Sequence, residues 1–185
     1  MDSKAPIILD ASSGFREMWV DKDNPIVVFL DQRDDGELSR DFDAYNSQRG
    51  RRGRRKWQPK NVTVKGDFRK LDFSDGRFKA VNWDPPHLKW LGEKSLFKKK
   101  YGELNAETWP DDIKRGAKEL FRVLEPGGFL FFKWNDNNIS IKTVLKLFPC
   151  KPLFCNTNSG VGKSKHGKPS HTYWCIFMKP EEAVS

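Results

Sequence analysis

The sequence predicts an α/β fold with a mainly parallel sheet of seven strands, because short apolar runs alternate with stretches of helical spacing. Several of these runs end in a carboxylate, as residues 26–30 do at Asp31. The last two runs are joined by a Gly/Ser/Lys-rich stretch without a helical pattern, which predicts a terminal antiparallel hairpin. Crossovers between parallel strands are right-handed, so the carboxyl ends of these strands should meet at one edge of the sheet.

The composition fits one basic domain over residues 1–185. The formal net charge is +9, which favours a polyanionic partner such as nucleic acid over an anionic membrane face. No apolar run approaches the ~18 residues of a membrane span, and the N-terminus lacks the apolar core of a signal peptide. We therefore expect a cytoplasmic protein.

The three cysteines, Cys150, Cys155 and Cys175, are odd in number and have no C-x-x-C spacing. This pattern argues against a disulfide framework and against a zinc site. We expect three reduced thiols and no bound metal.

The first strand, residues 7–9, is followed by Asp10-Ala11-Ser12-Ser13-Gly14 and then by a predicted helix start at residues 15–19. Small side chains in such a turn let the backbone approach a ligand closely, and a helix N-terminus favours a negative group. The stretch predicts a nucleotide-type binding corner, although it does not have the G-x-G-x-x-G pattern.

The second strand, residues 26–30, ends at Asp31. An acid at this position in doubly wound folds binds the two hydroxyls of a ribose. The alternative is a solvated strand end.

Residues 33–60 are polar and lack a hydrophobic period, which predicts a mobile, basic insertion at about residues 34–60. Six cations fall within eight residues of it and are expected to contact phosphates: Arg49, Arg51, Arg52, Arg54, Arg55 and Lys56. The alternative is a solvated run of charge.

A third strand, residues 62–65, leads to Asp67 and Phe68. Asp67 is placed to accept a hydrogen bond from an adenine amine while Phe68 packs near the ring. An aspartate that only caps the turn is an equal alternative.

The fourth strand ends in Asp84-Pro85-Pro86-His87. Prolines cannot continue a sheet ladder and they stiffen the turn, so the Asp84 carboxylate and the nearby backbone carbonyls should be held in place. A rigid cluster of acceptors suits an amine nucleophile, because it binds the N–H groups while the nitrogen attacks. The alternative is an ordinary strand-ending turn.

The rest of the chain contains a lysine-rich lid, two helices and three strands. The lid spans residues 87–101, and its Lys98 and Lys99 are expected to contact phosphate. Helices are predicted at residues 109–124 and 139–148. The strand at 129–134 should be buried on both faces, and a loop over 156–170 should precede a strand over 171–178.

Taken together, these motifs resemble those of class I S-adenosylmethionine-dependent methyltransferases over nearly the whole chain. The resemblance is carried by residues 8–14, by Asp31, by residues 67–69 and 84–87, and by Arg122-Val123-Leu124-Glu125-Pro126-Gly127-Gly128. More closely, the chain resembles the small methyltransferases common in phage and prophage genomes. The motifs that it shares with them are Arg16 with Met18-Trp19, and residues 84–87, 100–104 and 132–135.

The resemblance implies a Rossmann-like methyltransferase fold, S-adenosylmethionine as cofactor, and roles for the strand-end residues. Asp10 and Gly14, with Ala11 and Ser12 between them, would surround the methionine part of the cofactor. Asp31 would bind its ribose, and Asp67 with Phe68 its adenine.

Asp-Pro-Pro is similar to the motif of enzymes that methylate adenine N6 or cytosine N4. There the carboxylate of Asp84 and the carbonyl of Pro85 would bind the target amine, with His87 stacking on the extruded base in place of the family's Tyr, Phe or Trp.

The substrate remains open at this point. DNA or RNA is favoured by the basic stretches, and a small-molecule or protein amine is the alternative. A third possibility is a protein that binds cofactor or nucleic acid without turnover. The sequence does not predict an oligomeric state.

Overall fold

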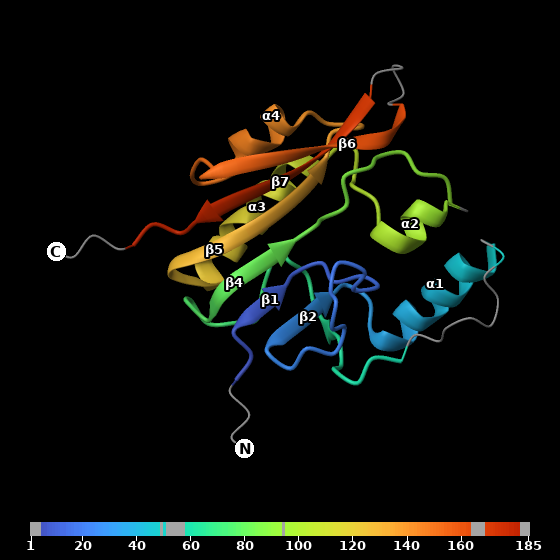
Figure 1. Ribbon diagram of the computed structural model, residues 1–185, viewed down its shortest axis with the longest axis horizontal. Coiled ribbons are helices and arrows are strands. Elements are labelled where there is room, and N and C mark those ends of the chain that lie inside the picture. The colour runs from blue at the N-terminus through green and yellow to red at the C-terminus, as the bar shows by residue number, and fades with distance from the viewer. Residues whose placement is uncertain (1–4, 49, 51–57, 94, 164–168, 182–185) are drawn as a thin grey trace.

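The computed structural model describes residues 5–48, 50, 58–93, 95–163 and 169–181. Its centre is a seven-stranded sheet in the order β3-β2-β1-β4-β5-β7-β6 (Figure 1). All neighbouring strands are parallel except at β7, which is antiparallel to both β5 and β6. The strands are β1 (Ile8–Asp10), β2 (Val27–Asp31), β3 (Val64–Lys65), β4 (Phe78–Trp83), β5 (Leu124–Asn135), β6 (Phe154–Lys163) and β7 (Pro169–Met178).

This sheet confirms the predicted fold class, including the terminal hairpin. The hairpin strands are longer than expected, because β6 continues to Lys163 and β7 begins at Pro169. The predicted loop over 156–170 is therefore wrong for most of its length: the two strands pair in an antiparallel register, which shifts between Ser159 and Lys163.

The described helices are α1 (Asp35–Gln48), α2 (Leu96–Tyr101), α3 (Trp109–Val123), α4 (Ile141–Val144) and a 3₁₀ turn, η1 (Leu145–Leu147). The predicted helix over 109–124 is confirmed by α3, which has Pro110 in its first turn and acids beside it. Its apolar stripe of Ile113, Ala117 and Leu120 is fully buried against the sheet. The helix expected at 139–148 is present as α4 and η1.

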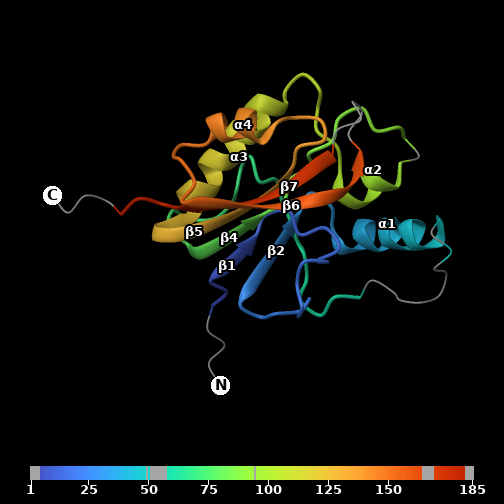
Figure 2. The same ribbon diagram turned by 45° about the horizontal axis from the view of Figure 1, so that its top comes forward.

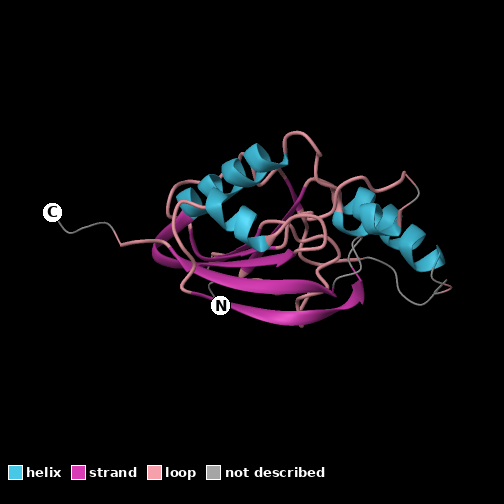
Figure 3. Cartoon of the chain, turned by 90° about the horizontal axis from the view of Figure 1, so that it is seen from above, coloured by secondary structure: helices cyan, strands magenta, loops and turns pink. Residues whose placement is uncertain are grey.

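Helices α3 and α4 cover one face of the sheet, as the view from above shows (Figure 3). In β5, Leu130 and Phe132 point to that face and are buried, whereas Phe129 and Phe131 are 40% and 38% exposed on the other face. The expectation that this strand is buried on both faces is therefore wrong, because no described helix covers the second face.

The helix predicted after β1 is absent, and residues 11–20 form a series of turns. Arg16 has a positive φ of 50°, which a helix cannot accommodate. Its buried guanidinium donates hydrogen bonds to the Thr63 hydroxyl (2.8 Å) and to the Lys22 carbonyl (2.8 Å). These contacts tie the segment to β3 and fix a compact loop beside the cavity described below.

The predicted insertion at 34–60 is wrong for residues 35–48, which form α1. This helix packs Leu38 and Tyr45 against Phe15 in a second, small core, and it extends away from the sheet beside α2 (Figures 1 and 2). Its apolar side chains were too widely spaced among charges to indicate a helix. The basic residues Arg49, Arg51, Arg52, Arg54, Arg55 and Lys56 lie outside the described residues.

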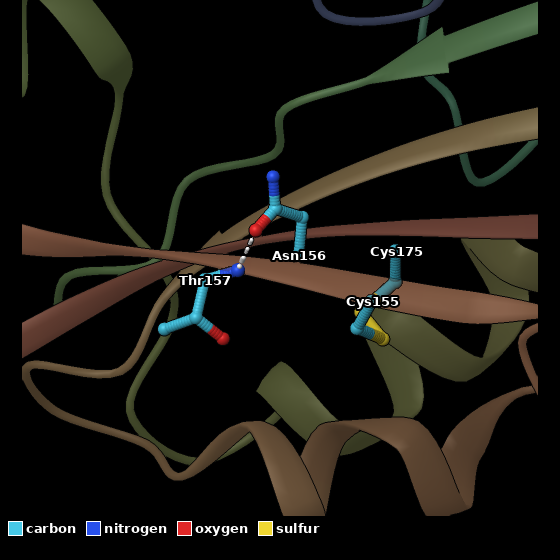
Figure 4. Close-up of a disulfide and its surroundings, with 4 residues drawn as sticks. All are labelled: Cys155, Asn156, Thr157 and Cys175. Carbon is cyan, nitrogen blue, oxygen red and sulfur yellow. Dashed lines mark hydrogen bonds between the residues drawn. A yellow bond between two sulfur atoms is a disulfide. The ribbon is translucent and has the colours of Figure 1, made fainter.

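Cys155 and Cys175 form a disulfide across the β6–β7 hairpin (Figure 4), so the expectation of three reduced thiols is wrong for this pair. The two residues are direct partners in the antiparallel register, which brings their side chains together although they are 20 residues apart in the sequence. Cysteine spacing alone does not reveal such a cross-strand pair.

None of the helices in the described part of the chain is both long and apolar enough to cross a membrane.

Candidate functional site

The loops after the parallel strands surround a cavity of about 600 Å³. Its walls come from the turns after β1, β2, β3 and β4, from helices α1, α2 and α3, and from β5. Of the residues predicted to be functional, those that line it are Asp10, Ala11, Ser12, Gly14, Asp31, Phe68, Asp84 and Lys98; those outside its wall are Asp67, Pro85, His87 and Lys99. The fold thus brings together the strand-end residues that the sequence singled out.

Asp10 is fully buried at the end of β1. Its carboxylate accepts hydrogen bonds from the Trp19 indole N–H (2.6 Å), the Asn82 amide (3.2 Å) and the Ser12 backbone N–H (3.4 Å). Burial raises its pKa from 3.8 to about 6, because desolvation outweighs the three hydrogen bonds. Asp10 therefore fixes the conformation of the first turn.

Gly14 occupies the left-handed region, with φ of 48°, and its N–H donates to Asp31 Oδ2 at 2.9 Å. This bond joins the turn after β1 to the end of β2. Arg33 donates to the same Asp31 carboxylate from its backbone N–H (3.0 Å), Nε (2.9 Å) and Nη2 (3.2 Å). Four donors therefore fill the acceptor capacity of Asp31.

Asp67 is bound in the same way by Arg69, whose Nε and Nη2 lie 2.9 and 2.6 Å from its carboxylate oxygens. Arg69 also donates to Asp112 of α3 at 2.9 Å. Of this group, Arg69 and Asp112 line the cavity, whereas Asp67 does not. Phe68 lies at the wall with its ring 5.3 Å from the buried ring of Trp83.

Asp84 stands at the end of β4, where its backbone N–H donates to the Ser12 hydroxyl at 2.8 Å. Its Oδ2 accepts from the Lys133 ammonium at 2.6 Å, and Lys133 comes from β5. Oδ1 is buried, and no donor in the described part of the chain reaches it. The carboxylate is therefore anchored through one oxygen and has acceptor capacity left on the other.

His87 lies behind the wall of the cavity. Its ring centroid is 6.1 Å from that of Trp134 and 6.4 Å from that of Tyr101, and of these three side chains Tyr101 lines the cavity. Burial lowers the pKa of His87, which favours the neutral imidazole. Trp83 and Trp134 are fully buried in the core.

The lysines of α2 have acidic neighbours. Lys98 lies 2.9 Å from Glu93 and 3.0 Å from Glu103, and Lys100 is paired with Glu17. The Lys99 carbonyl accepts from Arg33 at 2.6 Å. Two of the three charges in this basic run are thus balanced locally.

Sequence reasoning missed Lys133, Arg33 and Tyr101 as residues of the site. Lys133 had a signal, because it is the single charged residue in the run 129–134. Arg33 had one as well, since Asp31-Gln32-Arg33 and Asp67-Phe68-Arg69 repeat the same acid-x-Arg pattern after two successive strands. Tyr101 had none, because its position depends on how α2 folds over the strand ends.

Within the described residues, no three His, Cys, Asp or Glu side chains are grouped closely enough to hold a metal ion.

No family model and no curated protein sequence matches the chain. Among solved structures, the chain is similar to an S-adenosylmethionine-dependent methyltransferase from Methanosarcina mazei, with 14% identity, 98% of this chain and 95% of the other covered, and a TM-score of 0.54. It is also similar to an rRNA methylase from Streptococcus thermophilus, with 12% identity, 96% and 89% covered, and a TM-score of 0.52. A third neighbour is the [4+2]-cyclase SpnF, with 14% identity, 98% and 78% covered, and a TM-score of 0.55.

At these identities the similarity establishes the Rossmann-like methyltransferase fold. The SpnF neighbour shows that this fold also carries other chemistry. The function of the chain therefore has to be argued from its own site.

Proposed function

We propose that this protein is an S-adenosylmethionine-dependent methyltransferase that modifies an exocyclic amine of a nucleobase, adenine N6 or cytosine N4, in DNA or RNA. The observation that carries the proposal is the Asp84 carboxylate: Lys133 anchors one of its oxygens, and the other is buried without a donor in the described part of the chain. A buried acceptor of this kind requires a donor, and an amine N–H is one.

The cavity fits the cofactor in size and in its polar groups. A volume of about 600 Å³ lies within the range of small-molecule sites. The turn at Gly14 allows close approach of a ligand to the backbone, and the Asp31 carboxylate is the acceptor for ribose hydroxyls. Because the acceptor capacity of Asp31 is filled, the Arg33 side chain has to give up contacts when the ribose binds.

S-adenosylmethionine supplies a methyl group on a sulfonium, and the C–S bonding pair stays with sulfur as the new C–N bond forms. Asp84 Oδ1 accepts one N–H of the amine and orients the nitrogen lone pair. As positive charge develops on that nitrogen, the fixed carboxylate stabilises it. The nitrogen then loses one proton to water. We assign the second N–H to the Pro85 carbonyl, as the resemblance implies.

The proposed kinship with phage-type enzymes rests on residues 84–87 and the other shared motifs.

A second candidate function is methylation of a small-molecule or protein amine. One observation favours it: Lys98 and Lys100 are paired with acids beside the cavity, so their attraction for a phosphate backbone is reduced.

The test is transfer of labelled methyl from S-adenosylmethionine to duplex DNA, single-stranded DNA and RNA in parallel, with wild type and Asp84→Ala. We expect label on at least one polymer with wild type and its loss with Asp84→Ala, while cofactor affinity by calorimetry stays within a few-fold. Equal activity of the two proteins would refute the role of Asp84. Cofactor binding without label on any polymer would favour the second candidate.

A further inference from the structure

The rim of the cavity carries two stacked aromatic rings from α2. Tyr101 lines the cavity, and Phe97 lies one helical turn before it. Their ring centroids are 6.2 Å apart and their planes are inclined by 22°. On the inner side, Tyr101 continues through His87 to Trp134. A series of neighbouring aromatic rings therefore connects the buried core to the exposed Phe97.

Phe97 is not required for the packing of α2. The neighbouring Leu96 packs against the small core of Phe15, Leu38 and Tyr45, whereas Phe97 is 57% exposed. Single exposed apolar side chains are common and need no explanation by themselves. Phe97 differs from such cases because its ring lies nearly parallel to a ring that lines the cavity.

The charged groups beside these rings give little net attraction for a phosphate. The Lys98 ammonium lies within 3.0 Å of carboxylates of both Glu93 and Glu103, and Lys100 pairs with Glu17. The carboxylates of these glutamates offset the charges of Lys98 and Lys100 in the electrostatic field that a phosphate would meet. At this part of the rim, stacking on the aromatic rings is therefore a stronger interaction for a nucleic acid than attraction between the lysines and a phosphate.

We infer that the Phe97–Tyr101 ring pair is a stacking platform for unpaired nucleobases, so that the substrate is presented as single-stranded DNA or RNA. The inference rests on the proposed function, and it names how that site recognises its polymer. A base in a duplex has both faces covered by its neighbours, whereas an unpaired base has a free face to stack on an aromatic side chain. Stacking tolerates any base, so it supplies affinity without a sequence requirement.

The test measures binding of fluorescently labelled oligonucleotides by anisotropy, with cofactor present. The polymers are single-stranded DNA, single-stranded RNA and a DNA duplex of the same sequence. The variants are Phe97→Ala and, as a matched control, Phe154→Ala. Phe154 is 61% exposed on the edge strand β6 and is not part of the cavity wall, so the control removes an equally exposed ring elsewhere.

We expect wild type to bind at least one single strand more tightly than the duplex. Phe97→Ala should weaken single-strand binding by about 5- to 100-fold, the loss of one stacked base, and Phe154→Ala by less than about twofold. Equal affinities of the two variants, or tighter binding of the duplex by wild type, would overturn the inference.

Failure of the platform can be separated from failure of the proposed function. If Phe97→Ala binds like Phe154→Ala while wild type still methylates a polymer in an Asp84-dependent manner, only the platform is wrong. If no polymer accepts a methyl group but a small amine does, the proposed function itself fails. The DNA and RNA arms identify which polymer is recognised.

Discussion

Asp10 is a buried carboxylate held by three neutral donors, and no described cation forms a salt bridge with it. Its pKa of about 6, against 3.8 in an exposed chain, means that the folded state holds the proton more tightly than the unfolded state. Between these two values, stability must fall as the pH rises, because the folded protein loses a proton that the unfolded chain has already lost. The destabilisation is complete above pH 6.

Asp10→Asn removes this buried charge. We expect the variant to be more stable than wild type at pH 8, by up to about 3 kcal/mol, since one pKa unit corresponds to about 1.4 kcal/mol. The difference should shrink towards zero near pH 4. Urea unfolding of both proteins at the two pH values measures it, and a difference that does not change with pH would contradict the burial of an ionised Asp10.

Lys133 and Asp84 form the only charge pair that links β4 and β5 among the described residues. Lys133→Met keeps the aliphatic stem and removes the charge, so Oδ2 of Asp84 loses its anchor. Because the loss of fixed geometry weakens an interaction made in the transition state, we expect kcat to fall by about 10- to 100-fold.

The control for this prediction is the cofactor affinity of Lys133→Met, which should change by less than a few-fold. The variant should also add little to the effect of Asp84→Ala, since the two residues act as one unit. Full activity of Lys133→Met would show that the pair is not needed to position the carboxylate.

At the scale of elements, α3 meets the site through Gly116. A Cβ added there would lie 2.7 Å from the Phe68 ring and 2.9 Å from the Trp83 ring. The absence of a side chain therefore lets α3 approach the sheet where the wall of the cavity begins. Phe68 depends on this contact for its position.

Gly116→Ala should destabilise the protein by about 1–3 kcal/mol, the usual range for an overpacked core, and should weaken cofactor binding because Phe68 is displaced. Gly36→Ala in α1 is the matched control: its new methyl group would lie 3.3 Å from the Asp34 carboxylate and 3.9 Å from the Arg40 guanidinium, both ends of side chains, and alanine is the better helix former. Chemical denaturation and calorimetry compare the two. Equal free energies of unfolding for the two variants would mean that α3 can move away from Phe68 and Trp83 without destabilising the protein.

The sequence predicted the elements whose pattern is local. Apolar residues at helical spacing predicted the helix that contains Ile113, Ala117 and Leu120. Short apolar runs followed by an acid predicted the strands that lead to Asp10, Asp31 and Asp84. What depends on tertiary contacts was not visible. Arg16 turns the chain where a helix was expected, because its side chain finds Thr63, which is 47 residues away.

The prediction that the apolar run 129–134 is buried on both faces was wrong for a different reason. Its composition is that of a strand covered on both faces, yet the described helices cover only one. The pattern of a strand reports the hydrophobicity of each face and not which element packs on it. The cross-strand partner of Cys155 was equally hidden, because it follows from the register of the hairpin.

For the whole molecule, the recurring feature is an acid at a strand end that carries a basic partner. Asp31 with Arg33, Asp67 with Arg69, and Asp84 with Lys133 repeat this arrangement around one cavity. The sequence predicted the acids, and the folded chain shows their ion pairs with these basic residues. The proposed chemistry depends on the third pair, in which one carboxylate oxygen is left without a donor among the described residues.

The central claim is that the methyl group goes to an exocyclic nitrogen, and identifying the modified nucleoside tests it most directly. A polymer labelled by the wild-type enzyme would be digested to nucleosides, and the labelled species identified by chromatography and mass spectrometry. We predict N6-methyladenine or N4-methylcytosine as the only labelled base. Label on a ribose oxygen or on a ring carbon would contradict the assignment of Asp84 as the acceptor for an amine.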